Sequence, residues 1–315
     1  MSAGDGGPEE LAELAERAAT GEQRAIARLL SRVERSLRDA AEVLATVGQR
    51  ERSARTIGFV GPPGGGKSSI VAAVSSTLAG RDQRVAVLAY DPTGYDSGGA
   101  ILGDRVRMVS LARDRRIFIR SAGARDPLRT LGATTYPAVE VLARLGFDYV
   151  LIEAVGAGQA DIGTRHVADT TVLVLAPGAG DDVQAMKLGV MEIADVFVLN
   201  KSDLSGAPEA LRMLRQSSAM FARPLSQPRP VIAVSTIDGS GIADLISTLD
   251  ERAPRTSIPD GELVVEFVTY EFSRRIRAGH ALGPVLAGRV AGIQDGRDLV
   301  DVSLGIVDAA FANLV

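Results

Sequence analysis

The chain has 315 residues with a formal net charge of −4, and 46% of them are hydrophobic, as in a globular α/β protein of one large or two modest domains. Acidic and basic residues are mixed along the chain, which argues against a broad basic surface for nucleic acid. The absence of cysteine excludes disulfides, thiol nucleophiles and thiolate zinc sites, and two separated histidines disfavour a histidine metal site.

The N-terminus carries none of the signals of a secreted or membrane protein. It is acidic and glycine-rich, and no run in the chain approaches 18 apolar residues. We therefore expect a cytoplasmic protein that makes no membrane contact.

Residues 1–55 are predicted to form a helical segment. After a flexible start at residues 1–8, apolar residues recur at helical spacing from Glu9 to about Val47, with a break at Thr20 and Gly21. This pattern predicts two amphipathic helices, which need a surface to pack on.

Short β-rich runs begin at Thr56 and alternate with helical stretches. Continuous Val, Ile and Leu runs with helical crossovers predict a parallel sheet covered on both faces. The predicted strands are 56–60, 85–90, 149–153, 171–176, 196–199 and 231–234, and the predicted helices are 68–78, 137–145, 182–193, 209–221 and 242–249. This domain, residues 56–253, is followed by a C-terminal extension, residues 254–315, for which dimerisation is one candidate role.

A glycine-rich loop follows the first predicted strand and opens a helix, which is the context of a phosphate-binding loop. Glycines let backbone N–H groups turn toward phosphate oxygens, and the helix N-terminus adds donors and its positive dipole end. We expect Lys67 to bridge the β- and γ-phosphates of a nucleotide and the Ser68 hydroxyl to bind Mg²⁺. The predicted loop residues are Gly61, Pro62, Pro63, Gly64, Gly65, Gly66, Lys67, Ser68 and Ser69.

A second motif, Asn200-Lys201-Ser202-Asp203, follows a strand at the sheet edge where open α/β sheets bind ligands. The Asp203 carboxylate can accept hydrogen bonds from N1–H and N2–H₂ of guanine, a donor pair that adenine lacks. We expect the Asn200 amide to contact the N7/O6 edge of the base and the Lys201 stem to lie along its plane. Backbone contacts to the base are expected from Ser235, Thr236 and Ile237 after the last strand.

Lysine usage supports this interpretation. The 35 basic residues include only three lysines, and Lys67 and Lys201 belong to these two motifs, while Lys187 lies in a segment rich in Gly and Asp. A compact ammonium fits between phosphates, whereas a guanidinium is a wide fork of donors. The pattern predicts a GTPase.

Carboxylates at strand ends predict a magnesium site. Asp91 and Glu153 each follow a β-rich run, Gly156 lets the backbone approach the γ-phosphate, and Asp104 is a further candidate for the metal or the attacking water. The predicted metal ligands are Ser68, Asp91, Asp104 and Glu153, and the predicted catalytic residues are Lys67, Asp104 and Glu153. A helix cap or a surface charge is the alternative role for any one of these carboxylates.

Six segments then occur in a recognisable order: GPPGGGKSS, YDPTG, SGGAILGDRVRM, LIEAVGAGQ, APGAGDDVQAMKLGVMEIADVFVLNKSD and VSTIDGSGI. Over about residues 10–250 the chain resembles the MeaB/ArgK family of P-loop GTPases, the bacterial relatives of the human methylmalonic aciduria type A protein. The resemblance implies an α/β, parallel-sheet P-loop GTPase domain of the SIMIBI class with N-terminal helices and a C-terminal extension. It also implies that Ser68, Asp91, Asp104 and Glu153 surround Mg²⁺ and that Asp203 reads guanine.

The resemblance further implies a partner. Members of the family are homodimers that chaperone a cobalamin-dependent acyl-CoA mutase, gating cofactor delivery and protecting the mutase from inactivation. The chain departs from the family pattern at Arg105 and Leu188, where lysines are usual, at Ala154, where threonine is usual, and in the absence of a Trp-containing arm after residue 255. Two alternatives are an ATPase or kinase linked to basic amino-acid transport, and a GTP-dependent interaction module with little turnover. A nickel-delivery GTPase would be expected to carry a His- or Cys-rich segment, which this chain lacks.

Overall fold

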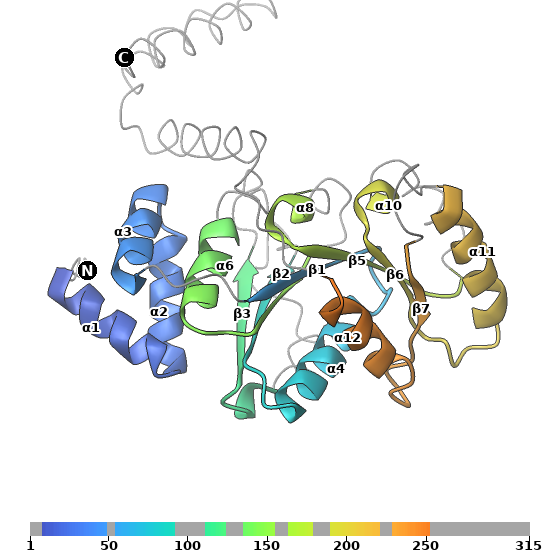
Figure 1. Ribbon diagram of the computed structural model, residues 1–315, viewed down its shortest axis with the longest axis horizontal. Coiled ribbons are helices and arrows are strands. Elements are labelled where there is room, and N and C mark those ends of the chain that lie inside the picture. The colour runs from blue at the N-terminus through green and yellow to red at the C-terminus, as the bar shows by residue number, and fades with distance from the viewer. Residues whose placement is uncertain are drawn as a thin grey trace, which may run out of the picture. The chain divides into compact units, whose positions relative to one another are not determined.

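The computed structural model describes residues 8–48, 54–91, 111–123, 135–154, 163–178, 190–220 and 229–252. Within these ranges the chain forms a seven-stranded sheet of order β3-β2-β4-β1-β5-β6-β7, with helices on both faces (Figure 1). Every neighbouring pair of strands is parallel. The predicted α/β fold with a parallel sheet is therefore confirmed, and the predicted extension 254–315 lies outside the described residues.

Six of the seven strands were predicted to within one residue at each end, and β3 was missed. In β3 only three apolar residues, Ile117 to Ile119, precede Arg120 and Ser121, because an edge strand is not buried on all sides. The strands are β1 Arg55–Val60, β2 Val85–Asp91, β3 Ile117–Gly123, β4 Tyr149–Glu153, β5 Thr170–Leu175, β6 Val196–Leu199 and β7 Val231–Ala233.

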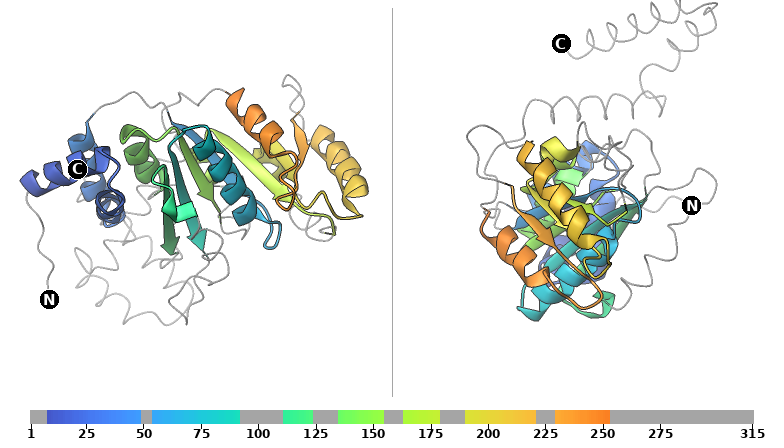
Figure 2. Two further views of the ribbon diagram at one scale, coloured as in Figure 1. Left: turned by 90° about the horizontal axis from the view of Figure 1, so that it is seen from below. Right: turned by 90° about the vertical axis from the view of Figure 1, so that its right-hand side faces the viewer.

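Helices α4 (Lys67–Gly80) and α12 (Ile242–Asp250) cover one face of the sheet, and α6 (Thr135–Arg144), α8 (Thr164–Val167) and α10 (Val190–Ile193) cover the other (Figures 1 and 2). Helix α11 (Ala207–Met220) packs beside β6 and β7. Alternate residues of the strands point to opposite faces of the sheet and pack in two mainly aliphatic cores. For example, Phe59 packs with residues of α4 and α12, whereas the next residue, Val60, packs in the core of the opposite face. Of the predicted helix 182–193, only α10 lies within the described residues.

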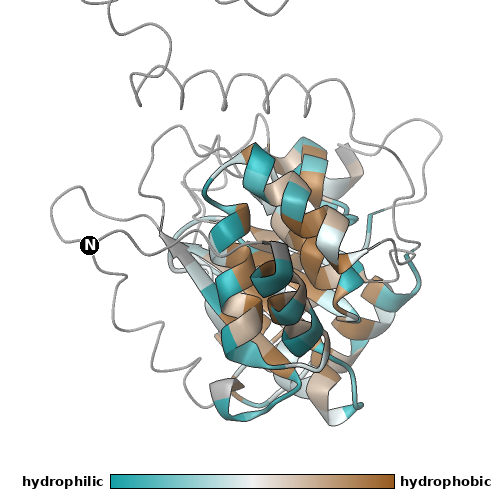
Figure 3. Cartoon of the chain, turned by 90° about the vertical axis from the view of Figure 1, so that its left-hand side faces the viewer, coloured by the Kyte–Doolittle hydropathy of each residue, from teal (hydrophilic) through white to brown (hydrophobic). Residues whose placement is uncertain are grey.

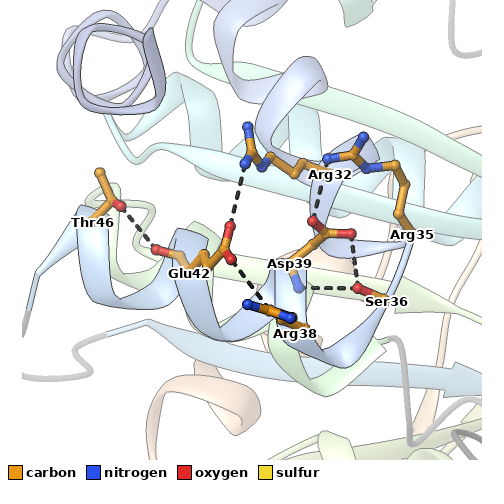
Figure 4. Close-up of polar contacts among 7 residues, drawn as sticks. All are labelled: Arg32, Arg35, Ser36, Arg38, Asp39, Glu42 and Thr46. Atoms are coloured by element: carbon orange, nitrogen blue, oxygen red, sulfur yellow. Dashed lines mark hydrogen bonds and ion pairs between the residues drawn. The ribbon is translucent and has the colours of Figure 1, made fainter. Parts of the chain in front are cut away.

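The N-terminal segment contains three helices, so the prediction of two was wrong. They are α1 Pro8–Ala19, α2 Gln23–Val33 and α3 Leu37–Val47. The break before α3 comes from Ser36, whose hydroxyl oxygen accepts a hydrogen bond from the Asp39 N–H at 3.1 Å as an N-cap (Figure 4). The apolar spacing runs on through this break, so the spacing alone predicts one helix where the Ser36 cap begins a second.

The N-terminal segment contacts the edge strand β3 through α2 and the residue that follows it. The Arg120 guanidinium on β3 donates to both carboxylate oxygens of Glu34 after α2, at 2.8 and 2.7 Å, and the Gln23 amide donates to the Ile117 carbonyl at 3.0 Å. Figure 3 views the molecule from the side that carries α1, α2 and α3, and each of these helices bears both hydrophilic and hydrophobic residues. Their buried residues join the core of one sheet face, so the helices are part of the folded unit.

Three aspartates stabilise the amino ends of the strands in the same way. Asp148, Asp169 and Asp195 each accept a hydrogen bond from the first N–H groups of a neighbouring strand, at 2.7, 2.8 and 2.9 Å respectively. Each aspartate directly precedes a strand of its own: Asp148 precedes β4, Asp169 precedes β5 and Asp195 precedes β6. These contacts fix the strand register at the edge opposite the carboxyl ends, where the predicted site residues gather.

Among the described helices, none combines the length and the apolar character needed to cross a membrane.

Candidate nucleotide-binding site

The loop from Gly61 to Gly66 joins β1 to α4 in a conformation that requires glycine. Gly61, Gly64 and Gly66 have φ angles of 137°, 76° and 91°, which side chains strongly disfavour. A Cβ atom on Gly61 would lie 2.2 Å from the Val174 carbonyl oxygen, and one on Gly66 would lie 2.0 Å from Nδ2 of Asn200. The loop is therefore packed closely against β5 and against the residue that follows β6.

Lys67 begins α4 and turns its side chain back into this loop. Its ammonium donates hydrogen bonds to the carbonyl oxygens of Gly61 at 2.8 Å and Pro62 at 3.1 Å, and the residue is only 7% exposed. A buried cation therefore lies at a helix N-terminus, whose dipole already favours anions. This is the electrostatic arrangement that a polyphosphate requires.

Ser68 and Glu153 meet beside the loop. The Ser68 hydroxyl donates to Oε1 of Glu153 at 2.5 Å, and Glu153 is buried at the end of β4, opposite Phe59 of β1 and Ala89 of β2. A hydroxyl and a carboxylate are the hard oxygen ligands that Mg²⁺ prefers. This donor pair fits the predicted magnesium site.

The rest of the predicted magnesium site is not described. Asp91 is the last residue of β2 rather than the residue after it, and its side chain, Asp104 and Gly156 lie outside the described residues. In the part of the chain that the structure describes, no group of three or more His, Cys, Asp or Glu residues could hold a metal ion.

Asn200 and Lys201 connect the predicted base motif to the phosphate loop. The Asn200 amide donates to the Gly65 carbonyl at 3.0 Å, and the Lys201 ammonium donates to the Gly64 carbonyl at 3.0 Å. Asn200 is 1% exposed, and its Oδ1 atom has no hydrogen-bond partner among the described residues. In this structure the Asn200 amide nitrogen is thus held by the phosphate loop.

Asp203 and Ser235 form the outer part of the site. The buried Ser235 hydroxyl donates to Oδ1 of the exposed Asp203 at 2.7 Å and accepts from the Ile237 N–H at 3.3 Å. The Ser202 N–H also donates to the Val234 carbonyl, at 3.1 Å. The residues predicted to contact the base, Ser235 to Ile237, therefore lie beside the carboxylate predicted to read it.

Two contributions to this site were not predicted from the sequence. The Val174 backbone packs on Gly61 and Gly65, and the Ser235 side chain, predicted only for its backbone, orients Asp203. Neither has a local sequence signal, because each depends on strands that are far apart in the chain.

A glycine-rich loop between β1 and a helix, joined on a parallel sheet to a second motif after β6, defines this protein as a P-loop GTPase by its fold and site. A sequence model of the family described as "Methylmalonyl Co-A mutase-associated GTPase MeaB" matches residues 23–257, and the chain belongs to this family.

Relatives with similar names agree with this assignment. A Pyrococcus abyssi protein named "Putative GTPase" is 35% identical over 283 residues, which are 89% of this chain and 85% of the relative. A Mycobacterium tuberculosis protein named "Probable GTPase" is 35% identical over 240 residues, 74% of this chain and 71% of the relative. The mouse mitochondrial methylmalonic aciduria type A homolog is 35% identical over 205 residues, 62% of this chain and 48% of the relative.

A crystal structure named as an LAO/AO transport system kinase has the same fold. It superposes with a TM-score of 0.62 at 23% identity, over 94% of this chain and 97% of the other. At this level of identity the likeness concerns the fold, and its name assigns no kinase activity to this chain. The protein is a GTPase that binds guanine nucleotides, as predicted.

Proposed function

We propose that this GTPase binds GDP and GTP with Mg²⁺, hydrolyses GTP, and chaperones a cobalamin-dependent acyl-CoA mutase of the methylmalonyl-CoA mutase type. The observation that supports its nucleotide chemistry best is the pair of hydrogen bonds from Asn200 and Lys201 to the phosphate loop. These bonds join the motif that contains Asp203, which we propose reads the base, to the loop that we propose holds the phosphates.

The phosphate roles follow from charge and position. The loop Gly61–Gly66 supplies backbone donors, and Lys67 supplies a cation for the β- and γ-phosphates. Ser68 and Ser69 lie in the first turn of α4, whose dipole faces the same anion. The Lys67 ammonium already occupies a carbonyl-lined position inside the loop, so a phosphate oxygen can join its hydrogen-bond partners with little reorganisation.

The metal roles follow from the oxygen ligands. Ser68 and Glu153 would hold Mg²⁺, with Asp91 and Asp104 completing the set. When bound, Mg²⁺ neutralises charge that develops on the phosphate oxygens during hydrolysis. Glu153 itself holds the Ser68 hydroxyl in place, and Asp104 is proposed to orient the attacking water.

Base selection is assigned to Asp203. Its carboxylate is held by Ser235 at the exposed rim of the site, where it can accept from N1–H and N2–H₂ of guanine. Adenine would leave these acceptors unpaired, which costs affinity. The backbones of Thr236 and Ile237 are proposed to complete the contacts around the base.

The proposed client rests on the family description, which names methylmalonyl-CoA mutase, and on the mouse relative, whose name concerns methylmalonic aciduria. We propose that the protein acts as a cytoplasmic homodimer, gates cofactor loading of the mutase and protects it from inactivation. A GTP-dependent interaction module with little turnover is the competing hypothesis.

GTP turnover with and without a purified methylmalonyl-CoA mutase tests this function. We expect measurable intrinsic hydrolysis and a change in rate when the mutase is added, and light scattering should detect a complex. A Lys67→Ala variant serves as the matched control for contaminating phosphatases. Absence of both a complex and any change in turnover would contradict the client assignment while leaving nucleotide binding intact.

A further inference from the structure

Strand β2 extends beyond the end of its neighbour β4. Its pairing with β4 ends where Ala89 lies opposite Glu153, whereas its pairing with β3 continues to Asp91, which lies opposite Gly123. Among the described strands, Tyr90 and Asp91 therefore pair only with β3, the edge strand at this end of the sheet. With strand pairing on one side, the carboxyl end of β2 needs further contacts to be held in place.

A side-chain hydrogen bond holds this end of β2 from a second direction. The Thr135 hydroxyl donates to the Tyr90 hydroxyl oxygen at 2.6 Å, within the usual range for such a bond. Thr135 is completely buried, and Tyr90 packs half-buried against the core on the α6 face of the sheet. Because a buried hydroxyl that loses its partner costs desolvation energy, this contact favours one position of Tyr90.

Thr135 is the fixed member of this pair. It is the first residue of α6, and every residue from Pro137 to Ala143 is buried. At the other end of the helix, the Arg144 guanidinium donates to the Leu44 carbonyl at 2.9 Å. Helix α6 lies between α3 and the sheet and contacts both (Figure 1). Because α6 is held along its whole length, the hydrogen bond positions Tyr90 rather than Thr135.

Tyr90 directly precedes Asp91, the proposed Mg²⁺ ligand on β2. Glu153, the buried carboxylate of the same proposed site, lies opposite Ala89 on the neighbouring strand and accepts a hydrogen bond from Ser68 of α4. Mg²⁺ requires nearly ideal octahedral geometry, so its ligands tolerate little displacement. A shift of the end of β2 would move Asp91 away from the ligands that β4 and α4 supply.

We infer that Tyr90 and Thr135 are positioning residues of the magnesium site, whose hydrogen bond fixes the carboxyl end of β2 and thereby holds Asp91 in place for Mg²⁺. They act through the strand backbone, because Tyr90 packs on the α6 face of the sheet, whereas Ser68 belongs to α4 on the opposite face. The inference rests on the proposed metal role of Asp91 and extends it to two side chains that supply no ligand themselves.

Two conservative variants, Tyr90→Phe and Thr135→Val, remove this hydrogen bond. Each should raise the Mg²⁺ concentration for half-maximal effect roughly 3- to 10-fold, both in GTP turnover and in binding of a non-hydrolysable GTP analogue. Turnover at saturating Mg²⁺ should stay close to the wild type, because the ligands are intact. The double variant should shift no further than either single variant, since both remove the same contact. Thr135→Ser keeps the hydroxyl and should behave as the wild type.

Tyr149→Phe is the matched control. It removes the hydrogen bond of another tyrosine hydroxyl, to Asp250, at the amino end of the neighbouring strand β4. The Mg²⁺ dependence should stay unchanged in this variant, even where thermal melting shows a loss of stability. A wild-type Mg²⁺ dependence in Tyr90→Phe or Thr135→Val, additive shifts in the double variant, or an equal shift in Tyr149→Phe would overturn the inference. Asp91→Asn tests the proposed ligand separately: an unchanged Mg²⁺ dependence there would contradict the metal role of Asp91 itself.

Discussion

The Asn200 amide nitrogen lies 3.0 Å from the Gly65 carbonyl oxygen, and the two residues are 135 positions apart in the sequence. A Cβ atom on the adjacent Gly66 would collide with the same amide. This contact joins the base motif after β6 to the phosphate loop after β1. A change at Asn200 should therefore affect phosphate binding as well as base binding.

Asn200→Ala tests this coupling. Removing one buried hydrogen bond of about 1–2 kcal/mol should weaken GDP and GTP by a similar factor, roughly 5- to 30-fold. The preference for guanine over adenine should remain, because Asp203 is intact. The measurement is calorimetry with GDP, GTP and ATP.

Ser202→Ala, in the same tetrapeptide, is the control for the Asn200 experiment, since the Ser202 side chain makes none of the contacts described above. It should bind all three nucleotides as the wild type does. If Asn200→Ala binds GDP normally but loses base preference, Asn200 acts on the base and the coupling account is wrong.

We expect that neither a neutral residue nor arginine can replace Lys67 in GTP turnover. Lys67→Ala removes the cation that faces the phosphates, and Lys67→Arg is too wide for a buried position whose ammonium contacts two loop carbonyls. We expect GTP turnover to fall by roughly 10²-fold or more in both variants. Single-turnover phosphate release measures this, and wild-type rates in Lys67→Arg would show that the position tolerates a planar cation.

Glu153→Gln should raise the Mg²⁺ concentration needed for half-maximal GTP turnover. The amide keeps the shape of the side chain and can still accept from Ser68, but it loses the negative charge that attracts the metal. GDP binding without Mg²⁺ should change little. Glu209→Gln on the exposed surface of α11 is the control, and an unchanged Mg²⁺ dependence in Glu153→Gln would remove Glu153 from the metal site.

Arg120 should anchor the N-terminal helices to the sheet. Its bidentate contact with Glu34 joins side chains that are only 16% and 19% exposed, so Arg120→Met should lower the free energy of unfolding by about 1.5–3 kcal/mol. Arg38→Met, which removes a contact of a 91% exposed arginine with Glu42, should have little effect (Figure 4). Equal thermal stability of the two variants would contradict the anchoring role.

The sequence allowed prediction of those elements whose apolar runs are continuous. Strands β1, β4, β5 and β6 are buried along almost their entire length, so most of their residues are apolar. Edge strand β3 was missed because Arg120 faces the N-terminal helices and interrupts its run. Helix α3 was not separated from α2 because Ser36 interrupts the chain without interrupting the apolar spacing.

The site was predictable as separate motifs but not as an arrangement. Glycine spacing and the Asn-Lys-x-Asp sequence are local signals, and both indicated nucleotide chemistry. The contacts that join them, Asn200 with Gly65 and Ser235 with Asp203, depend on strand order in the sheet, which no local pattern specifies. The contact expected between the Asn200 amide and a base edge stays a prediction.

The most direct test of guanine recognition compares GDP with XDP, whose base carries a carbonyl where guanine has the N2 amine. Wild-type protein should bind GDP far more tightly than XDP or ADP, because Asp203 can only accept hydrogen bonds. Asp203→Asn supplies a donor for that carbonyl and an acceptor for N1–H, so it should reverse the preference in favour of XDP. Equal affinity of the wild type for GDP and ADP, or an unchanged preference for GDP in Asp203→Asn, would contradict the assignment of Asp203 as the residue that selects the base.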